Sequence, residues 1–117
     1  MAYIDGFIVP VPTANKQAYL EMATKINALF KEHGALEIVE NWGTDVPEGK
    51  LTSFTMAVKR EDSETIVFSW IKWPSKAVRD EAWGTLMQNP LMQPGAMPPV
   101  FDGKRMIFGG FETMLQV

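Results

Sequence analysis

The chain has 117 residues, no cysteine and a formal net charge of −3 at pH 7, which predicts one domain spanning residues 1–117 with a single core. The acidic balance argues against a nucleic-acid partner, and the lack of cysteine excludes disulfides and thiolate metal sites. There is no run of about 20 apolar residues and no signal-peptide pattern, so we expect a soluble cytoplasmic protein without a membrane segment.

The first third of the chain predicts a strand, a helix and a second strand. Residues Tyr3–Val11 alternate as a strand, and Thr13 fits the N-cap of a helix from about Ala14 to His33. Gly34 is expected to end that helix in a left-handed conformation, before a strand at Ala35–Trp42. Spacings of three and four residues predict that one face of the helix is apolar, made of Tyr19, Met22, Ala23, Ile26, Leu29 and Phe30.

The longest predicted strand lies within Ser63–Lys76, which reads SETIVFSWIKWPSK. Alternate side chains of a strand point to opposite faces, and here neither face is polar. A strand of this kind belongs in the centre of a sheet that is covered on both sides. Residues 51–59, just before it, fit either a strand or a short helix capped by Thr52 or Ser53, and we favour the short helix.

The last third predicts a second helix and a final strand. Ser75 fits the N-cap of a helix that runs to about Asn89. Residues 90–101 form a long connection with four prolines, and connections of this length are often functional. The final strand is expected at Lys104–Leu115, where Gly109-Gly110 permits a bulge or a close backbone approach.

The order of these elements predicts an α+β protein with a ferredoxin-like βαββαβ arrangement, in which an antiparallel sheet carries two helices on one face. The first and third strands are central in this topology. The opposite face of the sheet keeps apolar side chains from the central strand, and a large exposed apolar patch indicates an interaction surface. We therefore expect a homodimer in which two sheets pack face to face around a two-fold axis.

Four segments of the chain resemble the YbaA-like family of small bacterial proteins of unknown function: YIDGFIVPVP, GALEIVENWGTDVP, VFSWIKWPSKAVRD and FDGKRMIFGGFE. The resemblance extends over nearly the whole chain and implies the dimeric α+β barrel fold. That superfamily includes cofactor-free monooxygenases, haem-degrading, dehalogenating and isomerising enzymes, and ligand-binding regulators. The resemblance therefore does not choose a reaction, and it carries no catalytic residue over to this chain.

Three side chains are candidates for acid–base chemistry: Glu40, Asp5 and His33. Glu40 and Asp5 each share a strand face with apolar neighbours, and a carboxylate in such surroundings either finds a partner or has a raised pKa. Arg105 and the neighbouring Lys104 enter the last strand and are candidate partners for either acid. His33 is the only histidine, but a position at a helix end explains it equally well.

Several large side chains are candidates for a ligand site: Trp42, Tyr3, Trp83 and Arg105. Such aromatic residues line an apolar pocket, or they form the core or a dimer interface. The sequence has no recognisable metal-ligand spacing and no nucleotide-binding or hydrolase motif, so we expect no metal and no cofactor.

The leading hypothesis is a homodimer that binds a small apolar or aromatic molecule, with or without cofactor-independent acid–base or oxygenation chemistry. The alternative is an interaction or structural homodimer without a small-molecule site. Whether an acid lies in a pocket between the helices and the sheet is the observation that separates the two.

Overall fold

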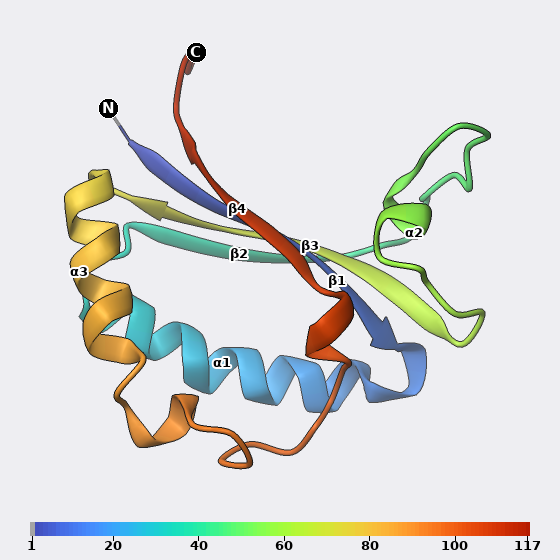
Figure 1. The fold of residues 1–117 in the computed structure, drawn as a ribbon, viewed down its shortest axis with the longest axis horizontal. Coiled ribbons are helices and arrows are strands. Elements are labelled where there is room, and N and C mark those ends of the chain that lie inside the picture. Colours follow the sequence, from blue (N-terminus) through green and yellow to red (C-terminus); the bar gives the residue numbers. More distant parts are fainter. Residues whose placement is uncertain (1) are drawn as a thin grey trace.

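The computed structural model describes residues 2–117, and its elements follow the predicted order (Figure 1). The strands and helices are β1 (Tyr3–Pro12), α1 (Lys16–Glu32), β2 (Glu37–Trp42), α2 (Phe54–Ala57), β3 (Glu64–Trp73), α3 (Lys76–Leu86) and β4 (Ile107–Glu112). Short 3-10 helices lie at Thr13–Asn15, Pro90–Met92 and Gly103–Arg105. Among the described residues, no helix is long and apolar enough to cross a membrane.

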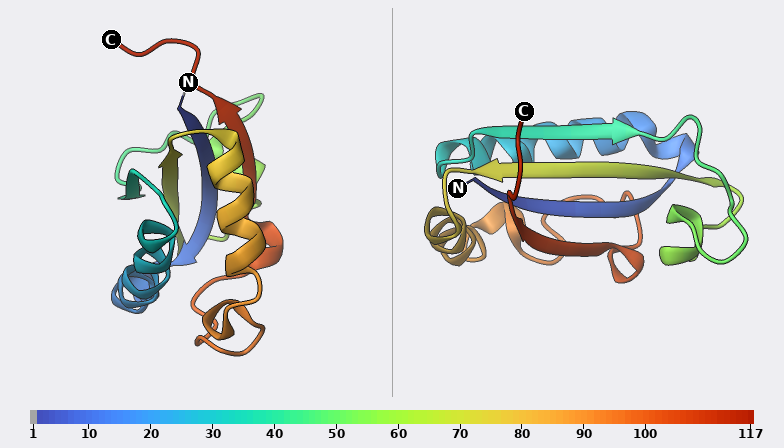
Figure 2. Two further views of the ribbon diagram at one scale, coloured as in Figure 1. Left: turned by 90° about the vertical axis from the view of Figure 1, so that its left-hand side faces the viewer. Right: turned by 90° about the horizontal axis from the view of Figure 1, so that it is seen from above.

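The four strands form one antiparallel sheet in the order β2-β3-β1-β4. The first and third strands are therefore central, as predicted. Helices α1 and α3 lie on the same face of the sheet, and the connection after α3 also passes below that face (Figures 1 and 2). This is the ferredoxin-like α+β arrangement expected from the element order.

The two faces of β3 have different surroundings. Val67 belongs to a core cluster with residues of α1, while Ile71 and the fully buried Trp73 pack with residues of α1 and α3. On the opposite face Phe68 is 43% exposed and contacts Trp70, with ring centroids 5.9 Å apart. Trp73 therefore faces the helices and Trp70 faces away from them, which the sequence pattern alone left open.

The ends of α1 are only partly as predicted. Thr13 does not cap the helix, because its hydroxyl is 2.7 Å from the hydroxyl of Thr65 and residues Thr13–Asn15 form a 3-10 turn before the helix begins. At the other end Gly34 has φ +110°, and the amide of Ala35 donates to the carbonyl of Phe30. This left-handed glycine ends the helix as expected.

The caps of α2 and α3 confirm two predictions. Ser53 accepts a hydrogen bond from the amide of Met56 at 3.0 Å, and Ser75 accepts one from the amide of Val78 at 3.2 Å. Residues 51–59 thus contain the short helix that we favoured. Helix α3 ends at Leu86, before the predicted Asn89, because Asn89 instead caps the 3-10 helix that starts at Pro90.

The last strand is shorter than predicted. Asp102 accepts a hydrogen bond from the amide of Lys104, and the resulting 3-10 turn delays the start of β4 until Ile107. A close backbone approach does occur at Gly110, where a Cβ atom would overlap the Tyr3 hydroxyl group and lie 2.9 Å from the Arg79 guanidinium. Only glycine leaves room for these two side chains.

Two glycine substitutions should shift stability in opposite directions. Gly34→Ala should lower the free energy of unfolding by about 1–2 kcal/mol, because its φ is left-handed and the new methyl group would lie 2.9 Å from Val78. Gly84→Ala has open space in the last turn of α3 and should raise the free energy of unfolding by about 0.5–1 kcal/mol. Urea denaturation of the two variants measures both effects. Equal effects of the two substitutions would contradict the assignment of the helix end.

A candidate site between the helices and the sheet

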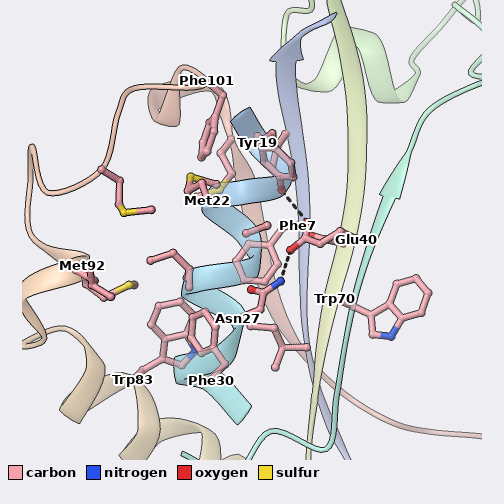
Figure 3. A pocket seen from close by; sticks show the side chains of 18 residues that line it. Phe7, Tyr19, Met22, Asn27, Phe30, Glu40, Trp70, Trp83, Met92 and Phe101 are labelled. Carbon is pink, nitrogen blue, oxygen red and sulfur yellow. Dashed lines mark hydrogen bonds between the residues drawn. The ribbon is translucent and has the colours of Figure 1, made fainter. Parts of the chain in front are cut away.

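A chamber of about 300 Å³ lies between the helix layer and the sheet (Figure 3). Its floor comes from β1, β2 and β3, one wall from α1, and the remaining cover from Trp83 and the connection after α3. Its 18 lining residues are Phe7, Val9, Tyr19, Met22, Ala23, Ile26, Asn27, Phe30, Glu40, Ser69, Trp70, Ile71, Trp83, Leu91, Met92, Met97, Phe101 and Met106. Trp70 borders the chamber from β3, but its indole ring points away from it (Figure 3). Most of them are apolar, so the few polar groups determine what the chamber can recognise.

Glu40 provides the carboxylate of this chamber. It lies on β2, and its side chain points toward α1 (Figure 3). The Tyr19 hydroxyl donates to Oε1 at 2.7 Å, and the Asn27 amide donates to Oε2 at 2.9 Å. Tyr19 and Asn27 are eight positions apart on α1, about two helical turns, so both reach the carboxylate from the same face.

The Tyr19 hydroxyl remains protonated in this arrangement. Its burial, together with the neighbouring Glu40 carboxylate, raises the pKa of Tyr19 well above its ordinary value. Tyr19 is therefore a fixed hydrogen-bond donor and not a base. Each oxygen of Glu40 accepts one of these two bonds and keeps further acceptor capacity for a third partner.

The connection after α3, residues 87–106, covers the chamber with adaptable side chains. Met92, Met97 and Met106 line the chamber, and the ring of Phe101 packs edge-on against Tyr19 with centroids 6.0 Å apart. Asn15 ties this segment to the start of α1 by donating to the carbonyl of Val100 at 3.0 Å. Methionine side chains fill irregular space readily, which suits a cover that fits ligands of different outlines.

A second hollow, of about 470 Å³, lies on the outer side of Glu40 at the edge between α1 and β2. It shares Tyr19, Ala23 and Glu40 with the inner chamber. Trp42 lines this outer hollow, where the Lys16 ammonium lies 5.2 Å from the centre of its ring. The predicted ligand residue Trp42 is thus placed outside the inner chamber, and Glu40 borders both spaces.

Asp5 lies on β1 in a separate cluster and is only 4% exposed. The indole groups of Trp73 and Trp83 donate to Oδ2 at 2.9 and 2.8 Å. Arg79 donates to both oxygens, with its closest contact at 2.8 Å. The hydrogen bonds to Asp5 raise the pKa of Arg79, which stays charged, and the carboxylate is compensated by this cation. With four donor groups on two oxygens, Asp5 is saturated and holds α3 against the sheet.

The aromatic candidates Trp83 and Tyr3 lie around this cluster. Trp83 reaches both sites, because its ring lines the chamber while its Nε1 donates to Asp5. Tyr3 lies away from the chamber, with the Arg79 guanidinium 5.2 Å from the centre of its ring. Only Trp83 of the four predicted ligand residues therefore lines the chamber.

Arg105 and His33 are also placed away from the chamber. Arg105 donates to both oxygens of Glu64 at 2.7 and 2.6 Å, so it pairs with neither Asp5 nor Glu40 as considered from the sequence. These hydrogen bonds lower the pKa of Glu64, a buried acid that this cation keeps ionised. The ring of His33 lies at the end of α1, with Nδ1 2.8 Å from the carbonyl of Leu29. Residues 2–117 contain no group of three or more acidic or histidine side chains arranged to hold a metal ion.

The family described as "Protein of unknown function (DUF1428)" matches residues 2–103. The chain belongs to this family. The "Uncharacterized protein YbaA" of Escherichia coli K12 is 56% identical over 115 residues, 98% of each chain, and its namesake in Shigella flexneri matches to the same extent. The resemblance seen in the four sequence segments is thereby confirmed.

A solved structure has the same fold as this DUF1428 member. It is described as a dimeric ferredoxin-like protein from an uncultured marine organism and superposes with a TM-score of 0.65. The match covers 99% of this chain and 98% of the other, at 10% sequence identity. At that identity the likeness shows the ferredoxin-like fold alone, and the site has to be interpreted from the side chains of this chain.

Sequence reasoning missed the two donors to Glu40. Tyr19 was assigned to the apolar face of α1, and Asn27 was not singled out. The available signal was a polar residue between Ile26 and Phe30, both of which belong to the apolar stripe that lines the chamber. An amide next to such a stripe, together with an acid on the facing strand, indicates a buried hydrogen bond.

Replacing Asp5 tests the role of the saturated cluster. Asp5→Asn should lower the free energy of unfolding by about 3 kcal/mol, because it leaves Arg79 without its buried counter-charge. Asp80→Asn is the matched control, since exposed Asp80 also contacts Arg79 but buries no carboxylate. Chemical denaturation compares the two variants with the unsubstituted protein. A stable Asp5→Asn variant would mean that the cluster does not anchor α3.

Proposed function

We propose that this protein binds a small apolar or aromatic molecule in the chamber between its helices and its sheet. The observation that carries the proposal is an apolar chamber that contains one carboxylate, Glu40, held by two neutral donors. Apolar pockets with a few convergent polar groups are the usual form of a ligand site.

The size of the chamber limits the ligand. A volume of about 300 Å³ lies at the lower end of the range for small-molecule sites, which corresponds to a molecule of about one or two rings. Phe7, Phe30 and Trp83 offer aromatic surfaces to such a ring. Their rings favour edge-on or offset contacts with an aromatic ligand over contacts with a flexible chain.

Glu40 is also the group that would accept a proton if the bound molecule reacts. Tyr19 stays protonated, and Asp5 has a cation and a full set of donors, so neither is available as a base. A general base needs a free lone pair within hydrogen-bond reach of its substrate, and Glu40 retains that capacity on both oxygens. Cofactor-independent acid–base or oxygenation chemistry would therefore centre on Glu40.

The uncovered face of the sheet supports a homodimer as the form in which the protein acts. Phe68, Ile107 and Phe111 are 43%, 40% and 61% exposed there. The charged residues Glu37 and Lys72 are cross-strand neighbours, so their charges balance within one copy. A two-fold interface brings a patch against itself, which requires an apolar and nearly neutral surface. The structural neighbour is described as dimeric, in agreement with a second copy as the occupant of this face.

Ligand binding can be detected by thermal shift with a panel of one- and two-ring aromatic compounds. A compound at ten times its dissociation constant should stabilise the fold by about 1.4 kcal/mol and raise Tm by about 5 °C. Met97→Trp should remove this shift, because the larger side chain fills the chamber from its cover. Met114→Trp, on the exposed C-terminal tail, is the control and should keep the shift. If no compound stabilises the protein while the dimer persists, a structural or interaction homodimer is the better description.

The dimer can be tested by changing the apolar sheet face. Phe68→Glu places a carboxylate in the proposed apolar interface and should produce a monomer, or a fold that is lost on dilution, in size-exclusion chromatography with light scattering and circular dichroism. Leu20→Glu changes an equally apolar, 54% exposed residue of α1 and should leave the dimer intact. A folded monomer of the unsubstituted protein at micromolar concentration would refute the proposed interface.

A further inference from the structure

We infer that the chamber selects molecules with an N–H or O–H donor, above all cationic amines, and rejects carboxylates of the same shape. This inference rests on the proposed ligand site and specifies its ligand class. The observation behind it is that Glu40 has no cationic partner, whereas the two buried acids, Asp5 and Glu64, each pair with an arginine.

The comparison shows how Glu40 differs from the two buried acids. Arg79 lies 2.8 Å from Asp5, and Arg105 lies 2.6 Å from Glu64. Among residues 2–117, no lysine, arginine or histidine lines the chamber, and no ion pair within 4.0 Å includes Glu40. The chamber therefore presents the field of a negative charge that only neutral donors offset.

The cation in the outer hollow does not alter this. Lys16 lines the outer hollow, where its ammonium faces the ring of Trp42. The hydrogen bond between Tyr19 and Glu40 lies between that hollow and the inner chamber, because both residues border the two spaces. A ligand in the inner chamber would thus meet the carboxylate and not the ammonium.

The free hydrogen-bonding groups around Glu40 also favour a ligand that donates hydrogen bonds. Tyr19 and Asn27 each already donate one hydrogen bond to Glu40 (Figure 3). Most of what these groups still offer is acceptor capacity, from the remaining lone pairs of Glu40 and the carbonyl oxygen of the Asn27 amide, against one remaining donor, the second N–H of Asn27. Ser69 adds one hydroxyl that can donate or accept. A ligand carboxylate would find few donors here and a like charge opposite it.

Four naphthalene probes of similar size test the inference by isothermal titration calorimetry at pH 7: 1-naphthylmethylamine, 1-naphthol, naphthalene and 1-naphthoate. The amine should bind most tightly and 1-naphthol next, each at least about tenfold more tightly than 1-naphthoate, as hydrogen bonds to charged groups imply. Naphthalene shows what the apolar walls contribute alone.

Glu40→Gln should remove the preference, since it keeps the shape of the side chain and deletes its charge. We expect the affinity for 1-naphthoate to rise and that for the amine to fall, each by about tenfold. Glu37→Gln is the matched control, because it removes the same charge from the same strand on the opposite face, where Glu37 accepts a hydrogen bond from Trp70. It should leave the ranking unchanged.

The possible results separate the inference from the proposed function. Binding of 1-naphthoate as tight as that of the amine to the unsubstituted protein overturns the inference and leaves the ligand site standing. Failure of all four probes to bind removes the ligand site and the inference together. If Glu40→Gln does not fold, as circular dichroism would reveal, the ranking on the unsubstituted protein still decides.

Discussion

The structure depends on the need to cover both apolar faces of β3. Trp73 and Ile71 turn one face toward the helices, and Phe68 and Trp70 turn the other away from them. A strand with two apolar faces is expected at the centre of a sheet, and the observed order places β3 between β2 and β1. In this chain α1 and α3 leave a gap over the sheet, which the long connection after α3 covers, and the chamber lies in that gap. The fold and the candidate site therefore have the same origin.

The acids of this interior illustrate two solutions to one physical problem. Burying a carboxylate is costly unless other groups replace the lost water, and a guanidinium does so most completely. Asp5 and Glu64 use arginines from distant parts of the chain, which ties α3 and the segment before β4 to the sheet. Glu40 uses only a hydroxyl and an amide. The arginine pairs use the carboxylates of Asp5 and Glu64 to stabilise the fold. The two neutral donors leave Glu40 part of its hydrogen-bonding capacity for a third partner.

Local patterns predicted the elements well, and long-range partners poorly. The period of the apolar residues placed α1, and the Ser53 and Ser75 caps and Gly34 marked boundaries correctly, because each depends on neighbours within a few residues.

The Asp5–Arg79 contact joins residues 74 positions apart, and no periodicity encodes such a pair. Arg105 was considered a partner for Asp5 or Glu40, yet it pairs with Glu64, since the 3-10 turn after Asp102 directs its side chain there. Thr13 had the right residue type for a cap, but a cross-strand contact with Thr65 took its hydroxyl.

The two ends of the chamber differ in the same way, because one is built on regular elements and the other on an irregular connection. The Glu40 end is built on β2 and α1, whose backbone hydrogen bonds fix the carboxylate and its two donors in place. The opposite side comes from a proline-rich connection whose methionines have no regular period and adopt many rotamers. A rigid polar end selects for one functional group, and an adaptable apolar cover tolerates variation in the rest of the molecule. We therefore expect selectivity to follow the charge and the donor of the ligand more closely than its outline, so that changes in the cover alter affinity for all ligands while changes at Glu40 alter their order.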